Sequence, residues 1–245
     1  MATKKTEETI EIRPIETVQV KIKIVGDSPL IMHAWSAKAK REILEKEIGA
    51  TKTKARDPKN PIEDFVSSLY WLTPMPTEFT SEAVGKILPE SKFGFPVTAF
   101  KQAAQSAAFR MGWTTSIMAM RGAFYILPDA EGYYAGDLEI NLEKKRITVI
   151  PNTYKSEAMI EIHSDPPVMR EDMVRVAKGA ADIRYRGQLN NWWAEMIVSY
   201  NTNGMYSLEQ IVNVINAGGF TCGVGEWRPE KDGMYGRYHV EASAV

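Results

Sequence analysis

A chain of 245 residues with 44% hydrophobic and 25% charged residues has the length and composition of an ordinary soluble globular protein with a sizeable core. Its formal net charge is −1, so a polyanionic partner has to be held by a local basic patch. The single cysteine, Cys222, excludes a disulfide framework and favours a reducing cytoplasm, and no apolar run approaches the roughly 20 residues of a membrane span.

Residues 1–14 are polar and lack the apolar core of a signal peptide. We therefore expect a disordered lead followed by one domain over 15–245. The first strand is predicted at about 18–25, where apolar side chains alternate with polar ones. A long insertion over 27–96 follows this strand.

The first part of the insertion is strongly charged. A helix is predicted to begin near residue 37 and to give way to a Lys/Arg-rich loop that contains Lys52, Lys54 and Arg56. These three residues follow no apolar period. The loop is either a mobile basic arm that contacts phosphates or a solvated surface arm.

The second part of the insertion carries an apolar cluster on a short helix predicted over 61–72. The cluster consists of Phe65, Leu69, Tyr70 and Trp71. Because connections longer than about 12–15 residues usually carry a function, we expect this insertion to reach a neighbouring subunit, with its basic arm along a shared nucleic-acid groove. The alternative is that the apolar cluster packs on its own domain.

Helices and strands alternate through the rest of the chain. The predicted helices are 97–111, a short one over 170–179, and 207–219, with Ser207 as N-cap and Gln210 completing a capping box. The predicted strands are 121–127, a hairpin over 136–151, 157–164, 180–187, 192–201 and 235–242. Without the insertions the order is strand, helix, strand, strand, helix, strand. We therefore expect an α+β fold with a ferredoxin-like, RRM-like βαββαβ core, a long and partly helical insertion, and extra β-hairpins.

A glycine-rich segment after the second core helix, residues 218–240, is the first candidate site. Glycines let backbone N–H groups turn toward a ligand, and cations and aromatic rings among them suit phosphates and bases. The candidate residues are Gly223, Gly225, Trp227, Arg228, Lys231, Tyr235 and Arg237. The alternative is a structural loop whose tryptophan packs on the domain.

Arginines upstream of this segment are the second candidate site. Arg184 and Arg186 alternate along a predicted strand and so share one face, which suits a phosphate backbone if that face is exposed. Arg170, Arg175 and Lys178 precede them. The alternative is ion pairing at the surface with Glu171, Asp172 and Asp182.

Lys101 is the third candidate. The helix dipole does not stabilise a cation at the start of a helix, so a lysine there hints at an anionic partner. Exposed lysines are also common there. Catalysis has little support, since the three histidines show no metal-ligand spacing, and we expect no enzyme, no cofactor and no metal. His33, in the turn after the first strand, is a candidate acid or base and leaves a metal-independent ribonuclease as one alternative.

Three segments share a pattern with a known superfamily: VKIKIVGDSPLIMH over 20–33, FPVTAFKQAAQSAAF over 95–109 and GGFTCGVGEWRPEKDGMYGRY over 218–238. Together they resemble the RAMP proteins, RRM-like CRISPR effector subunits that hold guide RNA, and above all the backbone subunits that polymerise along it. The chain also resembles a protein family frequent in tailed bacteriophages, in MREDMVRV and GVGEWRPEKDG. The resemblance implies nucleic-acid binding and head-to-tail assembly.

The leading hypothesis is a non-enzymatic, phage-encoded protein that binds single-stranded nucleic acid in the host cytoplasm, with DNA slightly favoured over RNA. Backbone charge and base stacking would carry the binding. The resemblance implies self-assembly into a ring or filament and a role in DNA replication or recombination. The rival is a structural or interaction protein that has kept the fold without nucleic acid, which the net charge of −1 favours.

Overall fold

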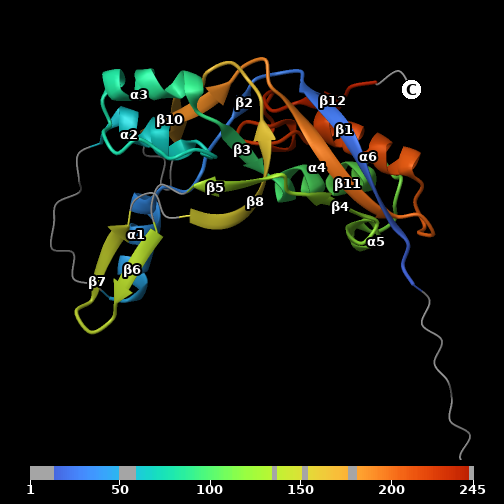
Figure 1. Cartoon of the computed structure of the whole chain (residues 1–245), viewed down its shortest axis with the longest axis horizontal. Helices are drawn as coiled ribbons and strands as arrows, with labels where there is room; N and C mark the ends of the chain where they lie inside the picture. The colour runs from blue at the N-terminus through green and yellow to red at the C-terminus, as the bar shows by residue number, and fades with distance from the viewer. Residues whose placement is uncertain (1–13, 50–58, 134–136, 151–153, 176–180, 243–245) are drawn as a thin grey trace, which may run out of the picture.

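The computed structural model describes residues 14–49, 59–133, 137–150, 154–175 and 181–242, and these form a mixed α+β fold with several antiparallel sheets (Figure 1). The largest sheet has the strand order β12-β1-β11-β4. Its strands are β1 (Thr17–Gly26), β11 (Trp193–Asn201), β4 (Phe124–Leu127) and β12 (Tyr238–Val240). All three pairings are antiparallel. The strands predicted at 18–25 and 192–201 are thereby confirmed to within a residue or two.

Two helices, α4 (Val97–Arg110) and α6 (Leu208–Thr221), lie behind this sheet in Figure 1. Alternate residues of β11, Ala194, Met196 and Val198, are fully buried and form part of the core that the helices share with the sheet. Both hydrogen bonds of the predicted capping box at Ser207 and Gln210 are present. Helix α6 therefore begins where the sequence predicts.

Gly218 is predicted from the sequence to end this helix, but α6 continues through Gly218 and Gly219 to Thr221. A Cβ atom at Gly218 would lie 2.8 Å from the backbone nitrogen of Ala104 in α4. A Cβ atom at Gly219 would overlap the carbonyl oxygen of Tyr238 in β12. These glycines do not terminate the helix; they let it approach its two neighbours closely.

Two smaller sheets extend the core. One has the order β3-β8-β5, from β3 (Phe93–Pro96), β8 (Tyr154–Ile162) and β5 (Ala130–Tyr133). The other has the order β2-β10-β9, from β2 (Leu30–Ile31), β10 (Ala181–Leu189) and β9 (Val168–Arg175). The helix predicted over 170–179 is wrong, because its described residues belong to β9. They pair with β10 from Val168 opposite Gln188 to Arg175 opposite Ala181, and this pairing overrides the weak local helix pattern.

The apolar cluster of the insertion packs on its own domain. Phe65, Leu69 and Trp71 are at most 3% exposed, and Tyr70 meets Phe95 edge to face at 5.3 Å between ring centroids. The alternative for this cluster, packing on its own domain, is therefore confirmed, while contact of the insertion with a neighbouring subunit stays a prediction. The helices of the insertion are α1 (Ala37–Glu47), α2 (Pro61–Ser68), α3 (Ser81–Ile87) and the 3-10 turn η1 (Leu88–Glu90).

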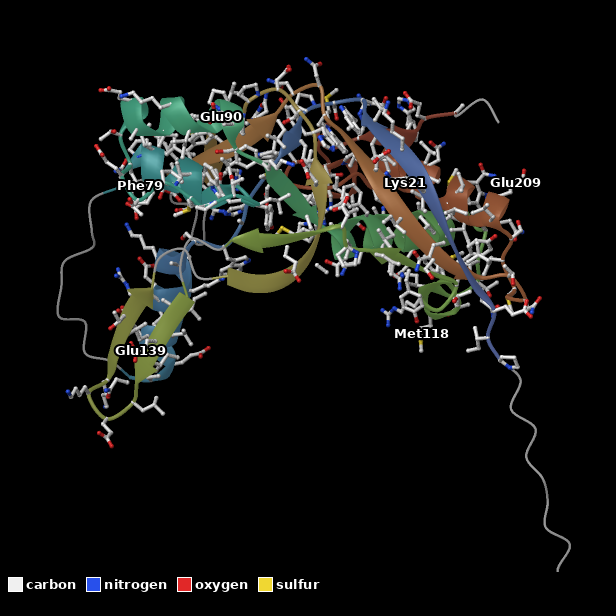
Figure 2. All side chains as sticks on the ribbon, viewed as in Figure 1. Lys21, Phe79, Glu90, Met118, Glu139 and Glu209 are labelled. Carbon is white, nitrogen blue, oxygen red and sulfur yellow. The ribbon has the colours of Figure 1, made fainter. Side chains whose placement is uncertain are left out.

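The predicted hairpin over 136–151 is present as β6 (Asp137–Asn141) and β7 (Arg146–Ile150), which lie beside α1 and apart from the main sheet (Figure 1). Glu139 of this hairpin, labelled in Figure 2, is exposed. Helix α5 (Ile117–Arg121) stands just before β4, and η3 (Pro229–Lys231) lies in the glycine-rich segment. Among the described residues, no helix combines the length and apolarity that crossing a membrane requires.

A matched pair of glycine substitutions tests the close approach of α6. Helix propensity alone favours alanine over glycine inside a helix by about 1 kcal/mol. We expect that gain, or no change, for Gly85→Ala in α3, where a Cβ atom would meet nothing within 4 Å. We expect Gly219→Ala to destabilise the protein by at least about 2 kcal/mol, because its Cβ atom would overlap Tyr238. Urea denaturation measures both; equal effects would contradict the packing described here.

Candidate nucleic-acid interface

The glycine-rich segment folds back on itself and docks on strand β2. Its backbone donates from Glu226 to the carbonyl of Ile31 at 3.0 Å and from Gly236 to the carbonyl of Pro29 at 2.8 Å. Gly225 and Gly236 have φ angles of +79° and +65°, and a Cβ atom at either position would clash with backbone of this same chain. The loop's own packing thus accounts for these glycines without a ligand.

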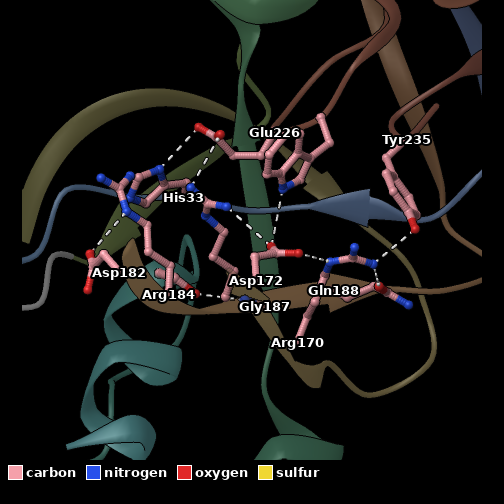
Figure 3. A network of polar contacts seen from close by, with 12 residues as sticks. His33, Arg170, Asp172, Asp182, Arg184, Gly187, Gln188, Glu226 and Tyr235 are labelled. Carbon is pink, nitrogen blue, oxygen red and sulfur yellow. Dashed lines mark hydrogen bonds and ion pairs between the residues drawn. The ribbon is translucent and has the colours of Figure 1, made fainter. Parts of the chain in front are cut away.

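A buried carboxylate fastens this loop to strands β9 and β10 (Figure 3). Asp172 is only 6% exposed and accepts from Arg170 Nε at 2.7 Å, from a terminal nitrogen of Arg186 at 3.2 Å and from Trp227 Nε1 at 3.2 Å. Arg186 is 3% exposed, so the expectation that Arg184 and Arg186 share an exposed face is wrong for Arg186. Its charge is directed inward because its partner is buried beside it.

Glu226 forms the other end of this network. His33 Nδ1 lies 3.1 Å from Glu226 Oε1, and Arg186 approaches Glu226 Oε2 at 3.5 Å. The hydrogen bond with His33 is the main cause that holds the pKa of Glu226 below its ordinary value of 4.5, and the charges of Arg186 and Arg228 lower the pKa further, while burial opposes them. The ionised form of Glu226 is therefore favoured in the folded protein.

Two more of the predicted arginines also have acidic partners. Arg228 donates to Glu230 Oε2 at 3.1 Å and to the carbonyl of Gly225 at 3.0 Å, which closes the loop on itself. Arg184 Nε lies 3.7 Å from Asp182 Oδ2, and both side chains are 39% exposed. The structure thus places Arg184 in an ion pair at the surface, which is the alternative given for this group of arginines.

Four of the predicted residues line one hollow of about 470 Å³ beside the loop. These are Arg170, Trp227, Tyr235 and Arg237, and Ser28, Asp172, Gly233 and Met234 complete the lining. The guanidinium of Arg170 lies 4.6 Å from the ring centroid of Tyr235 and donates to its hydroxyl at 3.0 Å. The hollow therefore combines aromatic surface with cationic groups.

Arg237 lines this hollow and has no carboxylate partner among the described residues. Its Nε donates to the carbonyl of Met234 at 3.3 Å, and it forms no ion pair with any carboxylate in the part of the chain that the structure describes. Trp227 is 38% exposed and Met234 is 72% exposed. A ligand entering the hollow would thus meet a free guanidinium and an accessible indole.

A second hollow of about 210 Å³ lies on the other side of the loop. Gly223, Gly225 and Arg228 line it together with His33, Glu226 and Glu230 and with the first turns of α4. Its charged residues are paired with one another, as described above. Groups of three or more His, Cys, Asp or Glu side chains suited to a metal ion do not occur among the residues that the structure describes.

The other predicted residues lie apart from these hollows. Lys101 Nζ sits 4.1 Å from the ring centroid of Tyr125, and burial lowers the pKa of its amine. Lys231 is exposed on η3 and Arg175 is exposed at the end of β9. Lys52, Lys54, Arg56 and Lys178 lie outside the described residues.

Sequence reasoning missed Ser28, Met234, Glu226 and the central role of Asp172. Asp172 was named as one of several ion-pair partners at the surface. The period-2 pattern of Arg170 and Asp172 on one face of a strand was the signal for it, but the helix predicted over 170–179 concealed that pattern.

No protein-family model matches the sequence, and no curated protein matches it. Among solved structures, the crystal structure of Cmr6 from Pyrococcus furiosus is similar over 93% of this chain and 100% of that chain, with 9% sequence identity and a TM-score of 0.38. A TM-score of this size is too low to decide the fold or the function.

Substitution of Asp172 tests how far the loop depends on the buried carboxylate. Asp172→Asn removes the buried carboxylate that Arg186 donates to and leaves this charge only its 3.5 Å contact with Glu226, so we expect a loss of about 3–5 kcal/mol in the free energy of unfolding. The matched control is Asp182→Asn, whose carboxylate is exposed to solvent and should cost less than about 1 kcal/mol. Urea titration monitored by circular dichroism measures both, and similar losses would refute the central role of Asp172.

Acid titration tests the pair formed by His33 and Glu226. A carboxyl whose folded pKa is depressed stabilises the fold above its unfolded pKa, and this stability is lost as the pH falls through the folded pKa. Between about pH 5 and pH 3, Glu226→Gln should therefore lose less stability than the native protein. Glu139→Gln, on the exposed hairpin, should follow the native profile. Urea midpoints across this pH range give the comparison, and coincident profiles for all three proteins would count against the pairing.

Proposed function

We propose that this chain is a non-enzymatic protein that binds single-stranded nucleic acid, and that the contact centres on the hollow lined by Arg170, Trp227, Tyr235 and Arg237. The observation that carries the proposal is the guanidinium of Arg237, which is free of carboxylates within the described residues and stands beside accessible aromatic surface. This combination suits one nucleotide: a base against the rings and a phosphate at the arginine.

The chemistry of the hollow fits bases of any identity. Base stacking on an aromatic side chain contributes about 1–3 kcal/mol and depends little on sequence. Arg170 is held in place by Asp172, Gln188 and Tyr235, so its charge is oriented before a ligand arrives. Preorganised groups of this kind lose little entropy on binding.

The pairing of the other arginines limits the electrostatic contribution. Arg186, Arg228 and Arg184 are each paired with a carboxylate, so few cations near the loop can release counterions from a bound strand. We expect the described residues to contact about one to three phosphates, which gives a slope of log K against log salt between about −0.7 and −2.

The finer parts of the proposal concern the fold and the context. The strand order β12-β1-β11-β4, with α4 following β1 and α6 following β11, supports a ferredoxin-like βαββαβ core and a place among the RAMP-like proteins. A phage origin, a preference for DNA over RNA, head-to-tail assembly and a role in replication or recombination rest on the sequence resemblance and stay predictions.

Fluorescence anisotropy with labelled 30-nucleotide DNA and RNA strands tests the proposal. Arg237→Ala and Trp227→Ala should each weaken binding by about tenfold, within the range of one lost stacking or charge contact. Trp227→Phe keeps a ring while losing the hydrogen bond to Asp172, so it should weaken binding less than Trp227→Ala. The matched control is Arg121→Ala, which removes an exposed arginine at the end of α5 and should leave affinity unchanged.

The outcomes separate this function from its rivals. Equal effects of Arg237→Ala and Arg121→Ala would move binding away from the hollow. No binding of either strand at low salt would favour a structural or interaction protein. Cleavage of the labelled strand that His33→Ala abolishes would favour a metal-independent ribonuclease, since His33 is held by Glu226 at the edge of the second hollow.

A further inference from the structure

Among the residues that the structure describes, β9 is the outer strand of its sheet. The pairing inside that sheet shows which backbone groups of β9 point away from β10 and have no described partner. Gly187 of β10 lies opposite Met169 of β9, yet its N–H donates to Ser68 Oγ at 2.7 Å and its carbonyl accepts from Met32 at 2.8 Å. Both groups of Gly187 thus point away from β9. In an antiparallel ladder Met169 then directs its own N–H and carbonyl away from β10, as do 171, 173 and 175.

The side chains of these same residues are exposed. Met173 is 78% exposed and Met169 is 45% exposed, while Glu171 and Arg175 are exposed and form no ion pair within the described ranges. Arg170 and Asp172, in contrast, face the glycine-rich loop. Within the described residues, the outer edge of β9 therefore presents an unpaired backbone, with exposed side chains in the alternating order Met, Glu, Met, Arg.

We propose that β9 pairs antiparallel with β9 of a second copy of this chain, about a two-fold axis at Met173. This register places Glu171 opposite the partner's Arg175 and, by symmetry, Arg175 opposite the partner's Glu171. The two Met173 side chains meet at the axis. Residues 171, 173 and 175 all direct their backbone groups outward, so each of these pairs also forms backbone hydrogen bonds.

The charges select this register from its neighbours. A two-fold axis at Glu171 would place two glutamates directly opposite each other, which is unfavourable. An axis at Asp172 would place Glu171 opposite the partner's Met173 and pair no charges. The register centred on Met173 satisfies both charges and covers the most exposed apolar side chain of the strand.

The pairing would join two β2-β10-β9 sheets into one continuous sheet. A two-fold axis through an antiparallel strand pair runs perpendicular to the sheet, so the same face of both copies points the same way. Both hollows beside Arg170 and Asp172 would then open on one side of the dimer. That consequence rests on the proposed function, whereas the pairing itself does not.

Exchange of the two charges tests the pairing in the full-length chain. Glu171→Arg places arginines opposite arginines, and Arg175→Glu places glutamates opposite glutamates, so each should weaken dimerisation by at least about tenfold. The double variant carrying both substitutions restores opposite charges and should return to within about threefold of the native dimer. Sedimentation velocity from about 1 to 100 μM measures the association, and thermal melts confirm that each variant is folded.

Three results would overturn the proposal: a monomer throughout this concentration range, a dimer that neither single substitution weakens, or a double variant that does not recover. Anisotropy with single strands on the same variants keeps the two proposals apart. A variant that no longer dimerises but still binds single strands would not contradict the proposed function. A native protein that dimerises but binds no single strand would contradict only the proposed function.

Cross-linking gives an independent test of the register. Met173→Cys places two thiols at the axis, where the Cα atoms of a hydrogen-bonded pair lie about 5.5 Å apart, within the range for a disulfide. Mild oxidation should link this variant into a dimer. Met169→Cys, on the same edge, would lie about 26 Å from its counterpart and should not cross-link. The native Cys222 is buried and contributes little background; equal cross-linking of both variants would exclude this register.

Discussion

The carboxylate of Asp172 is the one group on which the rest of the candidate site depends. It lies buried between two strands and a loop, and three donors from Arg170, Arg186 and Trp227 converge on it. A buried carboxylate without such partners would be strongly unfavourable, and so would the buried guanidinium of Arg186 without the carboxylate. The loop can therefore dock in this position because each charge satisfies the other.

This constraint also decides which charges remain for a ligand. Arginines that hold the loop in place cannot neutralise phosphates at the same time, so the number of arginines in the sequence overstates the basic surface. Arg237 differs because its Nε donates to the uncharged carbonyl of Met234, and only its backbone N–H donates to the hydroxyl of Ser28. Within the described residues, the site thus combines a network of paired charges with one arginine, Arg237, that has no carboxylate partner.

Local patterns predicted the main helices and strands well. The capping box at Ser207, the alternation along β1 and the helix predicted over 97–111 depend on residues close together in the sequence, and all three elements are confirmed. Residues that act through distant partners could not be predicted in this way. Strand β9 exists because it pairs with β10, and the glycines of α6 are explained by Ala104 and Tyr238, not by the end of a helix. The hollow itself needs Ser28, Arg170 and the loop 227–237, which meet only in the folded chain.

Strand β9 links the two proposals through the alternation of its side chains. Its even-numbered residues, Arg170 and Asp172, face the loop and build the hollow, while its odd-numbered residues carry the exposed edge. Because the period of a strand is two, a shift of β9 by one residue against β10 would exchange these sets and disrupt both surfaces. The buried pair of Asp172 and Arg186 opposes such a shift, since Asp172 would turn to the other face of the sheet and Arg186 would stay buried without this carboxylate. The same ion pair that docks the loop therefore also fixes which residues the edge of β9 presents to a second copy.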